Sequence, residues 1–285
     1  MSSQRKKISL KRITRRSTLG VLGIGIPSGI WAAGIEPNLL SITRKELTLP
    51  RWPKALDGFR VAQLTDIHFR PGTDDGMIAK LHEALGEEKP DLITLTGDFV
   101  INDPSSLPEL CRELKGISAP HGVIASPGNH DRWHCSTFNL RKEIEGTGMT
   151  YLQNQSTKLH IKGENIFVNG LDSIWGGQPL PGRAWQGHKK DEPVIALVHE
   201  PDPFDELHLS RPLDLQLSGH THGGQCRVPF FNYAPAKVKF GRKFIYGHFQ
   251  KGDAQLFVGR GLGTVGIRVR FACPPELVIL TLRSS

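Results

Sequence analysis

Side chains of the types that bind metal ions recur in five short fragments, each directly after an apolar run of strand length. In chain order, the fragments are Asp66-Ile67-His68, Gly97-Asp98, Gly128-Asn129-His130-Asp131, His199, and Gly219-His220-Thr221-His222. Sites in open α/β sheets gather where the carboxyl ends of strands meet. We therefore expect a fold in which five strands deliver their loops to one shared crevice.

Apolar runs and segments of helical spacing alternate between these fragments. The runs that we interpret as buried strands cover residues 61–64, 92–95, 123–125, 166–168, 194–198, 213–217, 256–258 and 277–282. Helical faces are predicted within 77–85, 107–114 and 140–144, with Ser136 as a cap for the last. Buried strands alternating with helices predict an α/β sandwich, and 285 residues are enough for one large domain.

The fragments combine hard oxygen donors with imidazole nitrogens, a donor set that suits divalent manganese, iron or zinc. They offer more ligands than one four-coordinate ion needs, and about enough for two ions that share a carboxylate. Each fragment alone has an ordinary alternative: Gly97-Asp98 could be a common turn, and His199 a hydrogen-bonded core histidine. The ordered set favours a two-metal hydrolase.

The fragments closely resemble the signature of the calcineurin-like metallophosphoesterase superfamily, and the resemblance covers about residues 56–283. The tail, with Gly259-Arg260-Gly261-Leu262-Gly263 and Cys273-Pro274-Pro275-Glu276, resembles a bacterial subgroup of exported or membrane-anchored phosphodiesterases. One branch of that subgroup hydrolyses UDP-2,3-diacylglucosamine. The resemblance implies a four-layer sandwich of two mixed β-sheets flanked by helices, with a dinuclear metal site at the carboxyl ends of the strands.

The resemblance also implies roles for individual residues. It assigns one ion to Asp66, His68 and His222, and the other to Asn129, His199 and His220. Asp98 would bridge the two ions with one oxygen for each. Manganese is the favoured metal, with iron or zinc as alternatives. A hydroxide between the ions would attack phosphorus in line with the leaving oxygen.

Two further residues of the third fragment are predicted to act in catalysis. The resemblance places His130 where it can stabilise the transition state or protonate the leaving group. Asp131 would orient that imidazole, and helix capping is its alternative role. Arg132 and Arg260 are weaker candidates for substrate binding, since each could also be a solvated surface side chain.

The amino terminus is basic and then apolar. Seven cations precede the first acidic residue, Glu36, and residues 17–35 carry no charge. Thr14-Arg15-Arg16-Ser17-Thr18-Leu19 resembles a twin-arginine signal. We predict an export signal or membrane anchor over 1–35, a linker over 36–44 and a catalytic domain over 45–285 that lies outside the cytoplasm. Residues 46–49 are expected to form a short edge strand.

The net charge of +8 does not indicate a nucleic-acid partner, because without those seven cations about +1 remains. The four cysteines lack C-x-x-C spacing, so we expect free, mostly buried thiols. The sequence thus predicts a metal-dependent hydrolase of a small-molecule or lipid-linked phosphodiester or pyrophosphate. A UDP-2,3-diacylglucosamine pyrophosphatase of lipid A synthesis is the alternative, although it requires a domain facing the cytoplasm. A catalytically inactive metal-binding scaffold is less supported, since every motif residue is present.

Overall fold

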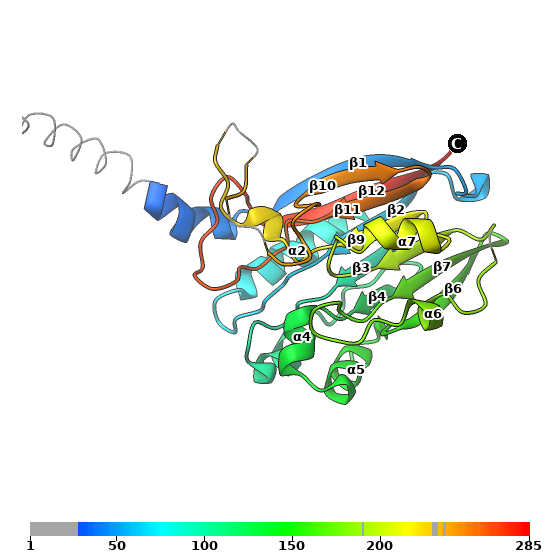
Figure 1. The fold of residues 1–285 in the computed structure, drawn as a ribbon. Coiled ribbons are helices and arrows are strands. Elements are labelled where there is room, and N and C mark those ends of the chain that lie inside the picture. The colour runs from blue at the N-terminus through cyan, green and yellow to red at the C-terminus, as the bar shows by residue number, and fades with distance from the viewer. Residues whose placement is uncertain (1–27, 190, 230–232, 236–237) are drawn as a thin grey trace, which may run out of the picture.

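Two six-stranded mixed sheets pack face to face in the computed structural model, which describes residues 28–189, 191–229, 233–235 and 238–285 (Figure 1). The first sheet has the order β1-β12-β2-β3-β4-β5 and the second the order β10-β11-β9-β8-β7-β6. In the first sheet only the β12–β2 pair is antiparallel. In the second sheet only the two outer pairs, β10–β11 and β6–β7, are antiparallel.

The strands of the first sheet are β1 (Ser41–Leu49), β12 (Glu276–Ser284), β2 (Phe59–Leu64), β3 (Leu92–Thr96), β4 (Val123–Ser126) and β5 (Thr150–Tyr151). Those of the second are β10 (Gly247–Lys251), β11 (Ala254–Val258), β9 (Leu215–Ser218), β8 (Val194–Leu197), β7 (Glu164–Gly170) and β6 (Gln155–Ile161). The α-helices are α2 (Asp75–Glu88), α3 (Leu107–Glu113), α4 (Asn129–His134), α5 (Thr137–Glu145), α6 (Pro181–Ala184) and α7 (Phe204–Ser210). Short 3-10 and π-helical turns lie at Trp31–Ile35, Glu36–Asn38, Lys54–Leu56, Pro104–Ser106 and His222–Gly224.

Three apolar clusters hold four layers together. The central cluster lies between the sheets and contains residues of both, such as Val61 and Leu280 from the first and Ile195 and Leu215 from the second. A second cluster joins α2, α3 and α5 to the first sheet, and a third joins α6 and α7 to the second. Each fully buried aliphatic side chain contributes about 1.5–3 kcal/mol of transfer free energy. The predicted four-layer fold is thereby confirmed.

The predicted helices form because their apolar faces are buried. In α2, Met77, Ile78, Leu81 and Leu85 all lie in the core, and the helix ends where Lys89 takes a left-handed conformation. Ser136 caps α5 by accepting a hydrogen bond from the main-chain N–H of Asn139 (3.2 Å). All four cysteines are free, and only Cys226 among them is not fully buried.

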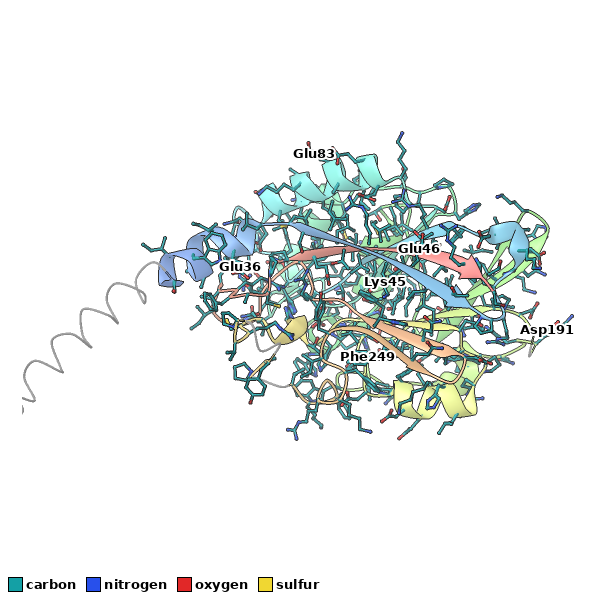
Figure 2. All side chains as sticks on the ribbon, turned by 90° about the horizontal axis from the view of Figure 1, so that it is seen from above. Glu36, Lys45, Glu46, Glu83, Asp191 and Phe249 are labelled. Carbon is teal, nitrogen blue, oxygen red and sulfur yellow. The ribbon has the colours of Figure 1, made fainter. Side chains whose placement is uncertain are left out.

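The predicted linker over 36–44 is wrong in its second half. Strand β1 begins at Ser41 and pairs in parallel with β12 along its whole length. Its middle residues, including Lys45 and Glu46, are exposed on an outer strand, so no apolar alternation marks the segment (Figure 2). The prediction of an edge strand holds, but the strand is longer than expected because the backbone of β12 specifies it.

The predicted signal or anchor lies mostly in residues 1–27, which are outside the described residues. Among the described residues, no helix is both long enough and apolar enough to cross a membrane. The helical segment at the described amino terminus lies at the opposite end of the molecule from the carboxyl terminus (Figure 1).

Five strands end at one edge of the sandwich, and the five fragments follow them. In the first sheet, β2, β3 and β4 are parallel neighbours, and in the second, β8 and β9 are. The sheets are joined at this edge by polar contacts: His199 Nδ1 lies 2.6 Å from the Thr96 carbonyl, and Gln63 Nε2 donates to the Ser218 carbonyl (2.8 Å). The fold therefore brings the five fragments into one crevice.

Candidate metal centre

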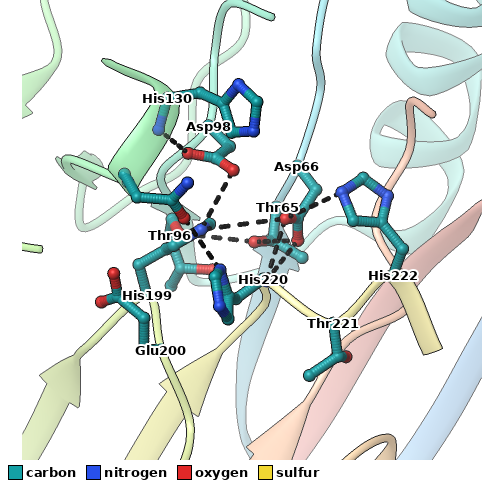
Figure 3. Close-up of polar contacts among 12 residues, drawn as sticks. Thr65, Asp66, Thr96, Asp98, His130, His199, Glu200, His220, Thr221 and His222 are labelled. Carbon is teal, nitrogen blue, oxygen red and sulfur yellow. Dashed lines mark hydrogen bonds and ion pairs between the residues drawn. The ribbon is translucent and has the colours of Figure 1, made fainter. Parts of the chain in front are cut away.

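The residues of the first ligand group that the resemblance implies lie close together in the structure. His222 Nε2 lies 3.4 Å from Asp66 Oδ1 (Figure 3). It also lies 3.1 Å from His68 Nε2, and all three side chains are buried. Asp66 is held by the main-chain N–H of His220, which lies 2.9 Å from one carboxylate oxygen and 3.0 Å from the other. The structure thus brings Asp66, His68 and His222 together around one point.

The second predicted group lies beside the first. His220 Nδ1 is 2.8 Å from Asn129 Oδ1, and the imidazole rings of His199 and His220 meet edge to face at 5.2 Å. His199 enters from the second sheet, and its Nδ1 donates to the Thr96 carbonyl. Because that contact occupies Nδ1, only Nε2 of His199 is left to face the crevice.

Asp98 lies between the two groups, but it does not offer one oxygen to each. Its Oδ2 is 3.3 Å from His68 Nε2 and 3.1 Å from His199 Nε2, whereas its Oδ1 accepts the main-chain N–H of His130 (2.9 Å). The expectation of a carboxylate shared oxygen by oxygen is therefore corrected. A single oxygen of Asp98 faces both groups, because a main-chain amide holds the other.

The backbone at these residues is strained. Five of the predicted ligands have left-handed φ values: Asp66 (49°), His68 (43°), Asp98 (56°), His220 (70°) and His222 (50°). Such conformations cost on the order of 1–3 kcal/mol each and persist where the surroundings over-determine them. Hydrogen bonds between loops do so here, such as Asp66 N–H to the Gly97 carbonyl (3.0 Å) and His68 N–H to the Asp98 carbonyl (3.0 Å).

Glycines allow the loops to approach the carboxylates closely. A Cβ atom at Gly128 would lie 2.2 Å from Asp98 Oδ1, and one at Gly219 would lie 2.1 Å from Asp66 Oδ2. No larger residue fits at either position without moving a carboxylate. The glycines of the G-N-H-D and G-H-x-H fragments are thus part of the site.

The electrostatics of the site favour a bound cation. Burial opposes ionisation of Asp98, but His199 and His68 outweigh it and hold the Asp98 pKa well below its usual value. Burial likewise opposes the charge on His199, yet Asp98 raises the His199 pKa well above its usual value. Burial lowers the pKa of His220, and it lowers the pKa of His222 by a larger amount. The lowered pKa values of Asp98, His220 and His222 favour the ionised carboxylate and neutral imidazoles that metal binding requires, whereas His199 must release a proton when it binds an ion.

The residues present fit divalent metal ions. Among the described residues, three overlapping groups have ligand atoms within 4.8 Å of one another: Asp66, His68 and His222; Asp66, Asp98 and His199; and His68, Asp98 and His130. The buried Nε2 of His199 faces two carboxylates that are also predicted ligands, Asp98 Oδ2 at 3.1 Å and Asp66 Oδ1 at 3.9 Å, so nitrogen and oxygen donors converge on one point. Oxygen and imidazole donors suit ions such as manganese, iron or zinc.

His130 lies at the opening of the crevice, where it is half-buried. Its ring meets the ring of His68 edge to face at 4.8 Å, and its Nδ1 donates to the Ile101 carbonyl. That contact leaves Nε2 as the nitrogen available to a substrate. Burial lowers the pKa of His130, so the imidazole is mostly neutral near pH 7.

Asp131 does not orient His130, and that prediction is corrected. Its carboxylate accepts the main-chain N–H groups of Asp98 (2.8 Å), Phe99 (2.8 Å), Val100 (3.2 Å) and Gly128 (2.9 Å). By accepting the Gly128 N–H, the Asp131 side chain caps the amino terminus of α4, which was the alternative role. Burial, followed by the Asp98 charge, raises the pKa of Asp131 to about 7, and the main-chain amides oppose this. Asp131 thus ties together the loops that carry Asp98 and Asn129.

The two predicted substrate-binding arginines are engaged elsewhere. Arg132 forms an ion pair with the buried Asp172 (3.0 Å) and donates to the Thr137 hydroxyl. Arg260 pairs with the buried Glu276 (2.9 Å) and donates to the Ser41 hydroxyl. Neither lines the cavity at the metal centre. Both predictions are therefore corrected, since these guanidinium groups stabilise the fold.

A cavity of about 290 Å³ opens above the ligands. Metal-ligand candidates form its floor, and its walls are mostly apolar or uncharged: Trp175, Thr221, Gly224, Gln225, Val238 and Val265. Trp133 lies beside Trp175, with ring centroids 4.8 Å apart. The sequence gave no signal for the valines, which belong to irregular loops.

Glu200, directly after His199, was missed by the sequence analysis. It is fully buried, and it accepts the Ser173 hydroxyl (2.6 Å) and the main-chain N–H groups of Ile174 (3.0 Å) and Trp175 (3.1 Å). These contacts fix the loop that presents Trp175 to the cavity. The sequence feature that could have pointed to Glu200 is its position directly after a histidine at the end of a buried strand.

Comparison with known proteins agrees with this geometry. A family model described as "Calcineurin-like phosphoesterase" matches residues 59–224. The chain is 30% identical to the uncharacterized metallophosphoesterase YkuE of Bacillus subtilis (strain 168), with 97% of this chain and 100% of the relative covered. It is 32% identical to the phosphodiesterase YaeI of Escherichia coli (strain K12), with coverage of 87% and 90%. It is 27% identical to the UDP-2,3-diacylglucosamine pyrophosphatase LpxG of Chlamydia trachomatis serovar D, with coverage of 91% and 94%.

Proposed function

The chain belongs to the calcineurin-like phosphoesterase family, and on that premise we propose that it is a phosphodiesterase with two divalent ions at the crevice. It is a metal-dependent phosphoric ester hydrolase, as predicted. The observation that carries the two-metal proposal is the position of Asp98 Oδ2, which lies 3.3 Å from His68 Nε2 and 3.1 Å from His199 Nε2. One oxygen between two ligand groups suits a pair of ions better than a single ion.

The residues divide the work as follows. Asp66, His68 and His222 would hold one ion, and Asn129, His199 and His220 the other, with Asp98 between them. When bound, such a pair supplies a nucleophile at neutral pH and neutralises charge on the phosphoryl oxygens. His130, with Nδ1 fixed by the Ile101 carbonyl, presents Nε2 at the opening, where the protonated ring can donate a hydrogen bond to the phosphoryl group or the leaving oxygen. Manganese is our proposed metal.

A diester is favoured over a monoester by the charge of the walls. None of the described residues that line the cavity is a lysine or an arginine. A diester carries one negative charge, whereas a monoester carries up to two and gains more from a nearby cation. The apolar wall formed by Val238, Val265 and Trp175 offers a contact surface to an uncharged or lipid-like substituent.

A lipid-linked pyrophosphate is the second candidate substrate. The relative LpxG is named for hydrolysis of UDP-2,3-diacylglucosamine, and it aligns with 91% of this chain. The apolar wall supports an acylated substrate, although the predicted topology would separate the site from a cytoplasmic nucleotide precursor.

We also propose that the protein acts outside the cytoplasm, either exported or anchored at the outer face of the cytoplasmic membrane. Residues 17–35 carry no charge and follow a basic segment, as in export signals and anchors. Large apolar side chains are exposed on the adjoining helical turns, at Ile30, Trp31, Ile35 and Leu39. Such a patch next to an apolar segment suits a membrane surface. Fractionation of cells expressing the chain, with and without Arg15→Lys and Arg16→Lys, would test this proposal.

The function is tested by hydrolysis of bis-p-nitrophenyl phosphate and of p-nitrophenyl phosphate. The metal-free protein would be compared with protein loaded with manganese, iron or zinc. We expect one metal to restore diester cleavage, with the monoester cleaved more slowly. Asp98→Ala should abolish the activity, and His130→Ala should reduce it, whereas Asp103→Ala, at an exposed turn carboxylate that caps a 3-10 turn, should not. Faster cleavage of the monoester, or activity without metal, would contradict the proposal.

A further inference from the structure

Arg270 is a fully buried side chain whose charge is met by main-chain carbonyls. Its guanidinium donates to the carbonyls of Gly263 (3.1 Å from Nε), Arg260 (2.9 Å), Gly261 (3.0 Å) and Cys273 (2.9 Å). No carboxylate of the described residues forms an ion pair with it. A buried charge is costly unless its surroundings compensate it, so this site is built around the guanidinium.

Most of these carbonyls belong to a loop that supports the first fragment. The main-chain N–H groups of Leu262 and Gly263 donate to the carbonyls of Thr65 (3.0 Å) and Asp66 (2.7 Å). The loop also packs without spare room: a Cβ at Gly261 would lie 2.6 Å from Asp66 Cβ, and one at Gly263 would lie 2.0 Å from the Ile67 carbonyl oxygen. The 260–263 loop is thus the wall behind the strained Asp66-Ile67-His68 turn.

The fourth carbonyl connects Arg270 to the last fragment. Cys273 Sγ donates to the His222 carbonyl (3.3 Å), and a Cβ at Gly223 would lie 2.9 Å from the same sulfur. Arg270 therefore fixes both segments against which Asp66, His68 and His222 rest. No hydrogen bond or ion pair between described residues joins the 260–273 segment to Asn129, His199 or His220.

We propose that Arg270 is a positioning residue for one of the two metal sites, the one formed by Asp66, His68 and His222. The proposal rests on the two-metal function above. Arg270 forms no hydrogen bond or ion pair with a ligand among the described residues. It acts by fixing the two segments whose main-chain groups hold the backbone of Asp66, His68 and His222 in the left-handed conformation. Loss of the guanidinium should weaken one ion and leave the other bound.

The test measures manganese binding to the purified full-length protein by calorimetry and by electron paramagnetic resonance. The variants are Arg270→Met, which removes the guanidinium, and Arg270→Lys, which keeps the charge but reaches fewer carbonyls. Arg268→Met is the matched control, because Arg268 lies two residues away and contacts Asn38 (2.7 Å) and Asp74 (3.5 Å) instead. The fold of each variant is checked by near-ultraviolet circular dichroism.

We expect the unaltered protein and Arg268→Met to bind two ions and to give the spectrum of a coupled manganese pair. Arg270→Met should lose affinity for one ion by about 10–100-fold, the range known for residues that support metal ligands, and should show the six-line spectrum of an isolated ion. Arg270→Lys should recover part of that loss. Two ions bound with unchanged affinity in Arg270→Met would overturn the proposal, and so would failure of both Arg270 variants to fold. An unaltered protein that binds fewer than two ions would instead contradict the proposed function.

Discussion

The floor and the rim of the cavity are built on different principles. By the floor we mean the seven predicted ligands, which lie at and beneath the base of the cavity; all are buried, and five of them are held in left-handed conformations. The rim contains the neighbouring indoles of Trp133 and Trp175, and these two residues are 43% and 36% exposed. The difference teaches that the backbone positions the ligands of the floor, whereas the rim offers exposed side chains, which we propose contact the substrate.

The largest effect is expected at the centre of the floor. Asp98→Asn should lower diesterase activity by at least about 10³-fold, because it removes the charge that faces both ligand groups. Metal content measured by mass spectrometry should fall below two ions per chain. Activity within about 10-fold of the unaltered protein would show that the floor does not work as one unit.

A support of the floor should come next. Asp131→Asn replaces an acceptor of four main-chain N–H groups with a side chain that has only one acceptor atom. Hydrogen bonds to charged groups contribute about 1.5–3 kcal/mol each, so we expect a loss of about 2–4 kcal/mol in the free energy of unfolding. Activity should fall by about 10–100-fold through displaced ligands. Urea unfolding and metal-saturated kinetics measure the two effects separately, and unchanged stability would contradict the role of Asp131.

The same difference explains what the sequence could reveal. Each floor residue follows a buried strand whose apolar run is legible, so the positions of Asp66, Asp98 and His199 could be predicted. The roles of Asp131 and Arg260 could not, because a carboxylate that binds main-chain amides looks the same in sequence as one that binds an imidazole. The predicted length of β1 was too short for a related reason, since the pairing of this strand with β12 depends on backbone contacts and not on apolar alternation.

A smaller and more selective effect is expected at the rim. Trp175→Ala should leave cleavage of bis-p-nitrophenyl phosphate within about 3-fold. It should raise KM for diesters of a nucleoside by about 10-fold, because stacking of a base on an aromatic ring is worth about 1–3 kcal/mol. The experiment is a comparison of KM and kcat for small and large substrates. An equal loss of kcat on all substrates would assign Trp175 to the floor and remove the distinction.

The smallest effect should come from a carboxylate outside both regions. Glu88 pairs with Arg60 (2.6 Å) and Arg44, and the Arg44 hydrogen bond is the main cause of the lowered Glu88 pKa. Glu88→Gln should leave activity unchanged and cost at most about 1 kcal/mol of stability at pH 7. A carboxylate whose pKa is lowered by folding stabilises the folded state at pH values above its pKa in the unfolded state. That stabilisation is lost as the pH falls through its pKa in the folded state. The two proteins should therefore converge in thermal stability in acid, and a difference that grows in acid would contradict this account.

The central claim is that two ions lie on the floor with one oxygen of Asp98 between them. Anomalous diffraction from crystals grown with manganese measures this directly. We expect two peaks about 3.5–4 Å apart, one beside Asp66, His68 and His222 and the other beside Asn129, His199 and His220. A single peak, or a pair in which His130 rather than His199 binds the second ion, would contradict the claim.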